Sequence, residues 1–313
     1  IREYLDLDDN IIELDITPNR GDCFSVLGVA REVSANYNMA FIAPDIEVNT
    51  VGKSSITTRV SNTSACPKYL TRSIKGIDNS ISTPKWMSDK LARSGQALHS
   101  PVVDITNYVL MELGQPMHAF DLEKINGAIE VRNTKSGETV ELLNESTVEL
   151  NQDTLVIADD ASVLAIAGVM GGESSSTQPT TTNILLESAF FEPVAIAGKA
   201  REYGLHTESS LRFERGVDFN ITELALDRAA QLVVEICGGE VSEITANIDQ
   251  SALPELSPIT ITQAKIQQVL GFELDSSWIE EKFINLDFEI SDKTNDSWTI
   301  IPPSFRFDIR IPA

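Results

Sequence analysis

The sequence predicts an α+β, multidomain protein: a central mixed α/β domain with a β-rich core, followed by a small winged-helix-like α+β domain. Between residues 127 and 190, short apolar runs alternate with turn residues at hairpin spacing, which is typical of an antiparallel or mixed sheet. Helical patterns with start and stop signals lie on both sides of this region. The length of 313 residues is enough for two or three domains.

The first unit is expected to cover residues 1–45, as the end of an N-terminal domain. The alternation in "IIELDI", residues 11–16, predicts a strand. After the turn "ITPNRGDC", Asp22 is expected to cap a helix that runs to about Asn36. The stretch "APDIEVNTVGKSS" then reads as a linker.

The central unit is expected to cover residues 46–250 and to open with strands at "SITTRV" and "KYLTRSI". Thr83 and Ser100 each precede a proline, so we expect each hydroxyl to cap a helix. The second of these helices should end at Gly114, which places His118 on a loop or at the start of a strand.

Six β runs follow, then a helix at about 192–202 and a longer one at about 219–237. Gly238 should end the longer helix. The residues on its expected inner face are Leu224, Ala225, Ala229, Leu232, Val233 and Ile236.

The last unit is expected at 258–313, after the linker "QSALPELSP". Thr262 should cap a helix that ends at Gly271, and Ser277 with Glu280 should form a capping box for the next helix. The segments "FEIS" and "SWTII" should pair as strands.

Composition restricts the class of protein. A formal net charge of −23 argues against broad electrostatic binding to nucleic acid, but leaves open a site for one end of an RNA. Three separated cysteines argue against a disulfide framework and fit a cytoplasmic protein. We expect no membrane span and no signal peptide. Because the chain starts with Ile and stops abruptly, we expect a piece of a longer protein.

Common catalytic and metal-binding patterns are missing from the sequence. The three histidines, His99, His118 and His206, lack metal-ligand spacing. The "GKSS" at residues 52–55 has no phosphate-loop setting and reads as linker, and no G-x-G-x-x-G or G-x-S-x-G occurs.

Four places carry informative chemistry. "GQPMHAFD" puts His118 just after a helix stop, and "AGVMGGESSS" puts Gly171 where backbone could approach a ligand or make a tight hairpin. "NILLESAFF" puts Glu187 in an apolar run, so its carboxyl is either buried with a function or turned to solvent. "GLHTESSLRFERG", residues 204–216, is dense in polar side chains.

These places lie in stretches that resemble the β subunit of bacterial phenylalanyl-tRNA synthetase. The resemblance covers nearly the whole chain. The stretches that carry it are "LDITPNRGDCFSVLGVAREV", "PVVDITNYVLMELGQPMHAFD", "LAIAGVMGGE", "LLESAFFEPVAIAGKAREYGLHTESSLRFERGVD" and "PPSFRFDI".

The resemblance implies an (αβ)2 enzyme whose α subunit activates phenylalanine. ATP and Mg²⁺ would serve the full enzyme, with no cofactor in this fragment. The central unit would be an editing domain that hydrolyses tyrosine wrongly attached to phenylalanine tRNA. A pocket shaped for phenylalanine rejects an added hydroxyl poorly, so a second, hydrolytic site is needed.

By this resemblance, Glu187 matches the acceptor for the tyrosine hydroxyl and Gly171 matches a backbone position of the same pocket. His118 matches the histidine that positions the ester or the attacking water. Thr207 and Ser209 match positions near the scissile bond.

Arg212 and Arg215 could contact the terminal nucleotide, or could instead pair with Glu214 and Asp218. Asp308 matches a Mg²⁺ ligand of the family, whose companion carboxylates would follow residue 313. A single carboxylate rarely holds Mg²⁺, so we do not expect this fragment to keep the ion.

Two positions depart from the family pattern. Relatives often carry Ala where Ser209 stands, and some carry Arg where Ala97 stands. These departures keep open a second hypothesis, a non-catalytic assembly and RNA-binding scaffold with a decayed editing pocket.

Overall fold

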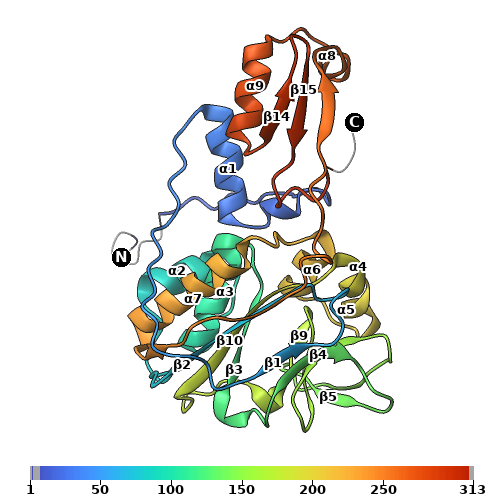
Figure 1. Ribbon diagram of the computed structural model, residues 1–313. Helices are drawn as coiled ribbons and strands as arrows, with labels where there is room; N and C mark the ends of the chain where they lie inside the picture. The colour runs from blue at the N-terminus through green and yellow to red at the C-terminus, as the bar shows by residue number, and fades with distance from the viewer. Residues whose placement is uncertain (1, 3–7, 310–313) are drawn as a thin grey trace.

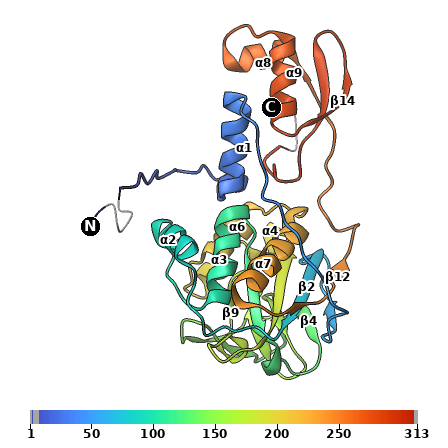
Figure 2. The same ribbon diagram turned by 90° about the vertical axis from the view of Figure 1, so that its left-hand side faces the viewer.

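A computed structural model describes residue 2 and residues 8–309. A large lower body holds two sheets and most of the helices, and a small domain stands above it (Figure 1). Helix α1 (Val26–Tyr37) stands between the two, beside helix α9 (Ser276–Asn285), as the turned view also shows (Figure 2).

The central sheet of the lower body is antiparallel, with the order β11-β2-β10-β3, and β12 also pairs with β2. Its strands are β2 (Lys68–Lys75), β3 (Met117–Asp121), β10 (Asn183–Phe190), β11 (Glu240–Val241) and β12 (Thr245–Ile248). Strand β10 is buried almost throughout, as its run of apolar residues predicts.

The second sheet has the order β1-β4-β7-β8-β9, and its only parallel pair among the described strands is β1 with β4. Its strands are β1 (Thr58–Val60), β4 (Ile129–Asn133), β7 (Leu155–Ala158), β8 (Val163–Ile166) and β9 (Met170–Gly171). A hairpin of β5 (Thr139–Glu141) and β6 (Thr147–Glu149) lies beside it. The predicted mixed β core is therefore confirmed.

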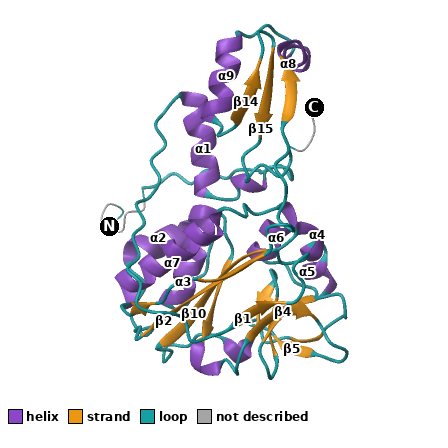
Figure 3. Cartoon of the chain, in the orientation of Figure 1, coloured by secondary structure: helices purple, strands orange, loops and turns teal. Residues whose placement is uncertain are grey.

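Helices cover one face of the central sheet, and the second sheet faces the other (Figure 3). The covering helices are α2 (Lys85–Arg93), α3 (Pro101–Leu113) and α7 (Ile221–Cys237). Along β10, Ile184 and Leu186 pack on these helices, while Leu185 and Ala189 face the core shared with the second sheet. The remaining short helices are α4 (Pro193–Ile196), α5 (Lys199–Glu202), α6 (Glu208–Arg215) and the 3-10 turns η1 (Gly21–Cys23), η2 (Leu122–Lys124) and η3 (Glu173–Ser175).

The small domain has its own core around Trp298 and Ile279. Its elements are β13 (Ile259–Thr262), α8 (Gln263–Leu270), α9, β14 (Glu289–Lys293) and β15 (Ser297–Ile301), with sheet order β13-β15-β14. The Thr262 hydroxyl accepts from the Lys265 N–H, and Gly271 ends α8 in a left-handed conformation, both as predicted.

The predicted strand at residues 11–16 is wrong. Residues 8–16 form no regular element, and Ile11 and Ile12 are 71% and 79% exposed. A strand needs a neighbour for its backbone N–H and C=O groups, and the described residues supply none here. The cap of α1 also differs from the prediction, because Ser25 accepts from the Gly28 N–H while Asp22 pairs with Arg20.

The capping predictions for Thr83 and Ser100 are also wrong. Ser100 is the cap residue of α3, but its hydroxyl makes no cap hydrogen bond. The Asp104 carboxylate instead accepts from the His99 N–H at 2.8 Å and from the Thr83 hydroxyl, since a charged acceptor binds such donors more strongly.

In the small domain, Asp275 takes the cap position of α9 without a side-chain hydrogen bond. Glu280 pairs with Lys293 at 2.9 Å instead of closing the predicted capping box with Ser277.

Two helix predictions need smaller corrections. The helix predicted at 192–202 is two short helices, because Gly198 between them has a φ of +80°. Leu224 of α7 is 42% exposed, since the buried stripe runs through Ala225 and Ala229 and leaves Leu224 at its edge.

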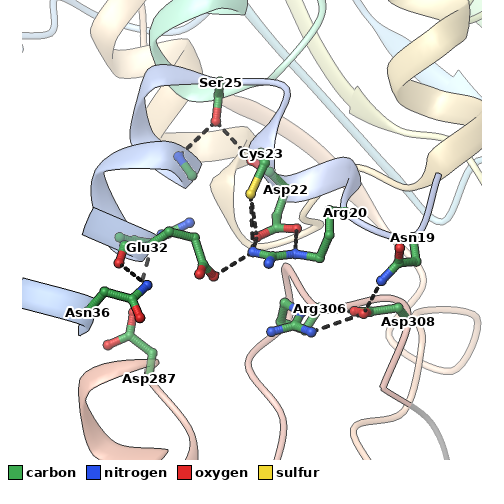
Figure 4. Close-up of polar contacts among 12 residues, drawn as sticks. Asn19, Arg20, Asp22, Cys23, Ser25, Glu32, Asn36, Asp287, Arg306 and Asp308 are labelled. Atoms are coloured by element: carbon green, nitrogen blue, oxygen red, sulfur yellow. Dashed lines mark hydrogen bonds and ion pairs between the residues drawn. The ribbon is translucent and has the colours of Figure 1, made fainter. Parts of the chain in front are cut away.

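Polar contacts hold the N-terminal turn in place (Figure 4). The Arg20 guanidinium lies between Asp22 at 2.8 Å and Glu32 at 2.5 Å. The Asn19 amide donates to Asp308 at 3.1 Å, so the turn is linked to the segment that follows β15.

Phe307 in that same segment packs against the lower body. Its ring stacks with Phe190 at the end of β10, at 6.1 Å between centroids, and lies against Gly216 at the end of α6. A Cβ on Gly216 would come within 2.6 Å of this ring.

We therefore expect Gly216→Ala to lower the free energy of unfolding by more than Gly204→Ala. Both glycines have positive φ, a backbone conformation that strains an alanine. Only Gly216 adds the clash with Phe307, worth about 1–3 kcal/mol more, because a Cβ on Gly204 meets nothing within 4 Å.

Urea unfolding of both variants, repeated in a Phe307→Ala background, measures this difference. The extra loss at Gly216 should shrink when the ring is removed. An extra loss that is the same in both backgrounds would contradict the packing described here.

Candidate active site at the centre of the sheet

Five of the residues singled out in the sequence line one cavity of about 250 Å³. They are Glu187, His118, Gly171, Thr207 and Ser209. An apolar cavity of about 150 Å³ is enough to bind benzene, so this one has room for a single aromatic amino acid.

Glu187 lies in the middle of β10, on the face directed at the second sheet. Glu187 is 6% exposed, so its carboxyl is buried and does not point to solvent, which was the alternative that the sequence left open. No described residue donates a hydrogen bond to this carboxyl. Burial raises the pKa of Glu187 from the ordinary 4.5 to about 8, so the folded state favours the protonated carboxyl.

His118 is the second residue of β3, and its Cα pairs directly with that of Glu187. The two side chains therefore share a face of the sheet. The His118 ring packs edge-on against Phe120 at 4.4 Å between centroids, and its Nε2 is buried without a partner among the described residues. Burial lowers the pKa of His118 from 6.5 to about 4, so the imidazole is neutral at neutral pH.

Gly171 makes room for this ring. A Cβ on Gly171 would lie 2.4 Å from His118 Cε1 and 2.9 Å from Nε2, closer than packed atoms approach. The φ of Gly171 is not positive, so the need for glycine comes from the close approach of the imidazole.

Thr207 and Ser209 lie at the start of α6, a helix that the sequence did not indicate. The Thr207 hydroxyl donates to the Val169 carbonyl at 2.9 Å and accepts from the Ser210 N–H at 3.0 Å, which caps the helix. The Ser209 hydroxyl donates to the Gly168 carbonyl at 3.2 Å. Both hydroxyls therefore fix α6 to the turn between β8 and β9.

Arg212 lies outside the cavity. Its Nε and Nη2 donate to the Phe24 carbonyl at 3.2 and 2.9 Å, and its Nη1 pairs with Glu208 at 2.5 Å. All three guanidinium nitrogens therefore bind acceptors within the protein, and Arg212 is not part of the site. The alternative pairing with Glu214 is wrong as well, because that carboxylate accepts from the Gly198 N–H.

The contacts of Asp308 are not those of a metal ligand. Its oxygens accept from Arg306 at 2.9 and 3.0 Å and from Asn19. Over the described ranges, no group of three or more His, Cys, Asp or Glu side chains could hold a metal ion. One carboxylate that is already paired does not fit Mg²⁺, which takes several oxygen ligands.

Three other positions named in the sequence analysis lie on the surface. His206, His99 and Ala97 are exposed, and His206 does not line the cavity. No helix in the described part of the chain is long and apolar enough to cross a bilayer.

A second chamber of about 510 Å³ adjoins the first and was not anticipated from the sequence. The two share Thr106, Asn107, Met117, His118 and Leu143 in their walls. The second chamber is also lined by His99 and Ser100 and by the loop around 173–179. Its residues come from separate elements, so no local pattern marks them.

Comparison with known proteins identifies the family. Residues 65–238 match the family model described as the B3/4 domain, which is more than half of the chain. The chain belongs to the B3/4 domain family. Residues 259–313 match the tRNA synthetase B5 domain.

Named relatives agree with the resemblance inferred from the sequence. The chain is 50% identical over 311 residues to the phenylalanine–tRNA ligase β subunit of Acinetobacter baylyi, covering 99% of this chain and 39% of the relative. It is 48% identical over 314 residues to that of Psychrobacter arcticus, with the same coverage of 99% and 39%. The chain thus spans about two fifths of the length of the curated relatives it matches.

A solved structure gives a more distant match. It is an N-terminal fragment of the phenylalanyl-tRNA synthetase β subunit from Pyrococcus horikoshii, with a TM-score of 0.44 and 17% identity, covering 99% of this chain and 90% of that chain.

We expect Gly171→Ala to displace the His118 ring and to lower the free energy of unfolding by about 1–3 kcal/mol. In a His118→Ala background the same substitution should cost much less, because the atoms that clash are gone. Urea unfolding of the four proteins of this cycle measures the coupling. Independent effects of the two substitutions would contradict the contact.

The raised pKa of Glu187 predicts a pH-dependent stability. Between about pH 4.5 and 8 the folded protein holds a proton that the unfolded chain has released. Stability must therefore fall as the pH rises through this window, by up to about 1.4 kcal/mol per pH unit. Glu187→Gln removes the proton exchange, so the variant should gain stability over the wild type as the pH rises.

Unfolding free energies of both proteins at pH 5, 6.5 and 8 check the sign. His118 contributes equally to both, with stability lost as the pH falls from 6.5 towards 4. A difference between the proteins that does not change with pH would show that Glu187 titrates as an exposed carboxyl.

Proposed function

We propose that the cavity at Glu187 hydrolyses the ester of tyrosine wrongly attached to phenylalanine tRNA. The proposal includes the setting: a β subunit that joins an α subunit in an (αβ)2 phenylalanine–tRNA ligase of the cytoplasm, which uses ATP and Mg²⁺ at a synthetic site outside this chain. The observation that carries it is an unpartnered, buried carboxyl in a cavity sized for one aromatic amino acid.

Selectivity comes from the hydroxyl of the substrate ring. The phenol of tyrosine donates to the Glu187 carboxyl and satisfies it. Phenylalanine fills the same apolar walls, such as Phe191 and Ile166, but leaves the carboxyl without a partner. Leaving such a buried acceptor unsatisfied costs about 1–3 kcal/mol, or about 5–150-fold in preference.

The ester end is placed by α6 and β3. The first N–H groups of a helix have no partner within it, so the backbone N–H groups of Glu208 and Ser209 can stabilise the negative charge on the ester oxygen. Neutral His118 accepts a hydrogen bond from the attacking water at Nε2 and orients it.

Hydrolysis proceeds without a covalent enzyme intermediate. Thr207 and Ser209 each donate their hydroxyl proton to a backbone carbonyl, and neither is hydrogen-bonded to a base. Their oxygens remain acceptors and would hold the α-ammonium group of the amino acid. The adjoining chamber behind His118 would admit the terminal nucleotide.

We expect Glu187→Ala, which removes the acceptor, to slow hydrolysis of Tyr-tRNA about 10–100-fold in the full-length subunit assembled with its partner. Single-turnover deacylation measures the rate. Glu192→Ala is the matched control, because this carboxylate follows β10 but lies outside the cavity, and it should leave the rate unchanged.

A rate unchanged by Glu187→Ala would exclude the acceptor role. The non-catalytic scaffold makes the opposite prediction for His118. A His118→Ala variant that deacylates as slowly as its wild type, with both near the uncatalysed rate, would favour the scaffold.

A further inference from the structure

A row of polar side chains crosses the otherwise apolar face of the central sheet at Glu187. The Cα of Glu187 pairs with that of Thr71 on β2 and with that of His118 on β3, so all three side chains share one face. Tyr69 lies two positions before Thr71 and faces the same way, within the core shared by the two sheets. The neighbours along β10 on this face, Leu185 and Ala189, are apolar.

The hydrogen-bonding capacity of this row is unmet. Tyr69 and Thr71 are both 0% exposed, and neither the Tyr69 hydroxyl nor Thr71 Oγ1 has a partner among the described residues. The Glu187 carboxyl beside them also accepts no hydrogen bond from the described residues. Buried polar groups are nearly always hydrogen-bonded, so a cluster of donors beside an acceptor requires a reason.

The two hydroxyls lie on the same face of the sheet as the carboxyl and do not line the cavity. Neither Tyr69 nor Thr71 lines the cavity, whereas Glu187 does. Directly opposed residues of paired strands have Cβ atoms about 4.5–5.5 Å apart, and diagonal positions are within reach of an aromatic side chain. Burial and the nearby Glu187 charge raise the pKa of Tyr69 far above its ordinary value, so its hydroxyl keeps the proton that it can donate.

We propose that Tyr69 and Thr71 are positioning residues for Glu187: when tyrosine occupies the cavity, the Glu187 side chain adjusts so that both hydroxyls donate to its carboxyl, which holds the carboxyl against the ring hydroxyl of the substrate. This inference rests on the proposed function and adds the residues that set its preference for tyrosine over phenylalanine. The two additional donors stabilise the deprotonated carboxylate, which is the form that accepts the phenol hydrogen bond most strongly. Phenylalanine has no ring hydroxyl, so these two donors do not strengthen its binding.

The test uses substitutions that remove only a hydroxyl, Tyr69→Phe and Thr71→Val. Calorimetry on the chain with tyrosine and with phenylalanine gives the ratio of the two dissociation constants. Each substitution should lower the tyrosine preference about tenfold through weaker tyrosine binding, and leave phenylalanine binding unchanged. Thr71→Ser keeps the hydroxyl and should keep the preference.

A second readout separates positioning from general damage. Loss of donors to the carboxylate should move the pKa of Glu187 upward, and with it the pH dependence of Tyr-tRNA deacylation by the assembled enzyme. Thr222→Val is the matched control. Thr222 of α7 is also 0% exposed, but its hydroxyl donates to the Phe219 carbonyl at 3.3 Å. It should change neither the preference nor the pH profile.

The outcomes distinguish the two proposals. A wild-type chain that binds tyrosine no better than phenylalanine would overturn the proposed function. A wild-type preference that persists in both Tyr69→Phe and Thr71→Val would overturn this inference alone. If Thr71→Val fails to fold, Tyr69→Phe, which keeps the ring, decides the question by itself.

Discussion

The burial of one carboxyl in a strand that is covered on both faces is the constraint on which the site depends. Strand β10 has apolar side chains on both faces, one packed on α2, α3 and α7 and the other on the second sheet. Glu187 interrupts the second of these faces without a partner among the described residues. Such a group costs free energy in the folded state, and a raised pKa is how the protein limits that cost.

The rest of the cavity is built by holding other elements close to this strand. His118 is placed by strand pairing with Glu187, and Gly171 permits the approach of its ring. The hydroxyls of Thr207 and Ser209 bind carbonyls of the turn before β9, which fixes the start of α6 over the cavity. These contacts shape the cavity, and they also engage the hydroxyl protons of Thr207 and Ser209 in hydrogen bonds to backbone carbonyls. This arrangement favours water over either hydroxyl as the nucleophile.

Contacts at the far end of α6 and β10 connect this region to the small domain. Phe307 packs on Gly216 and Phe190, while Asn19 and Arg306 hold the neighbouring Asp308. Arg212 reaches from α6 to the Phe24 carbonyl just before α1. The arginine that the sequence suggested for nucleotide contact thus joins two parts of the fold, because a buried guanidinium needs acceptors for all its donors.

The sequence by itself determined the class of the fold, most of the strands and the five residues around the cavity. Short β runs bounded by turn residues sufficed for β2, β10 and the hairpins, and the glycine stops at Gly114 and Gly271 were correct because they depend on local backbone conformation. Caps at Ser100 and Ser277 failed, since a nearby carboxylate or a shifted helix start decides which group bonds the helix end. The strand expected at 11–16 failed because a strand requires a partner.

Only the tertiary structure decided that Glu187 is buried, that α6 begins at the cavity and that Arg212 faces away from it. The alternation in "KYLTRSI" already put Tyr69 and Thr71 on one face, but no pattern within one strand shows which strands become its neighbours. Spacing along the chain fixes which side chains share a face. The pairing of β2, β10 and β3, whose residues lie far apart in sequence, fixes which of those faces meet.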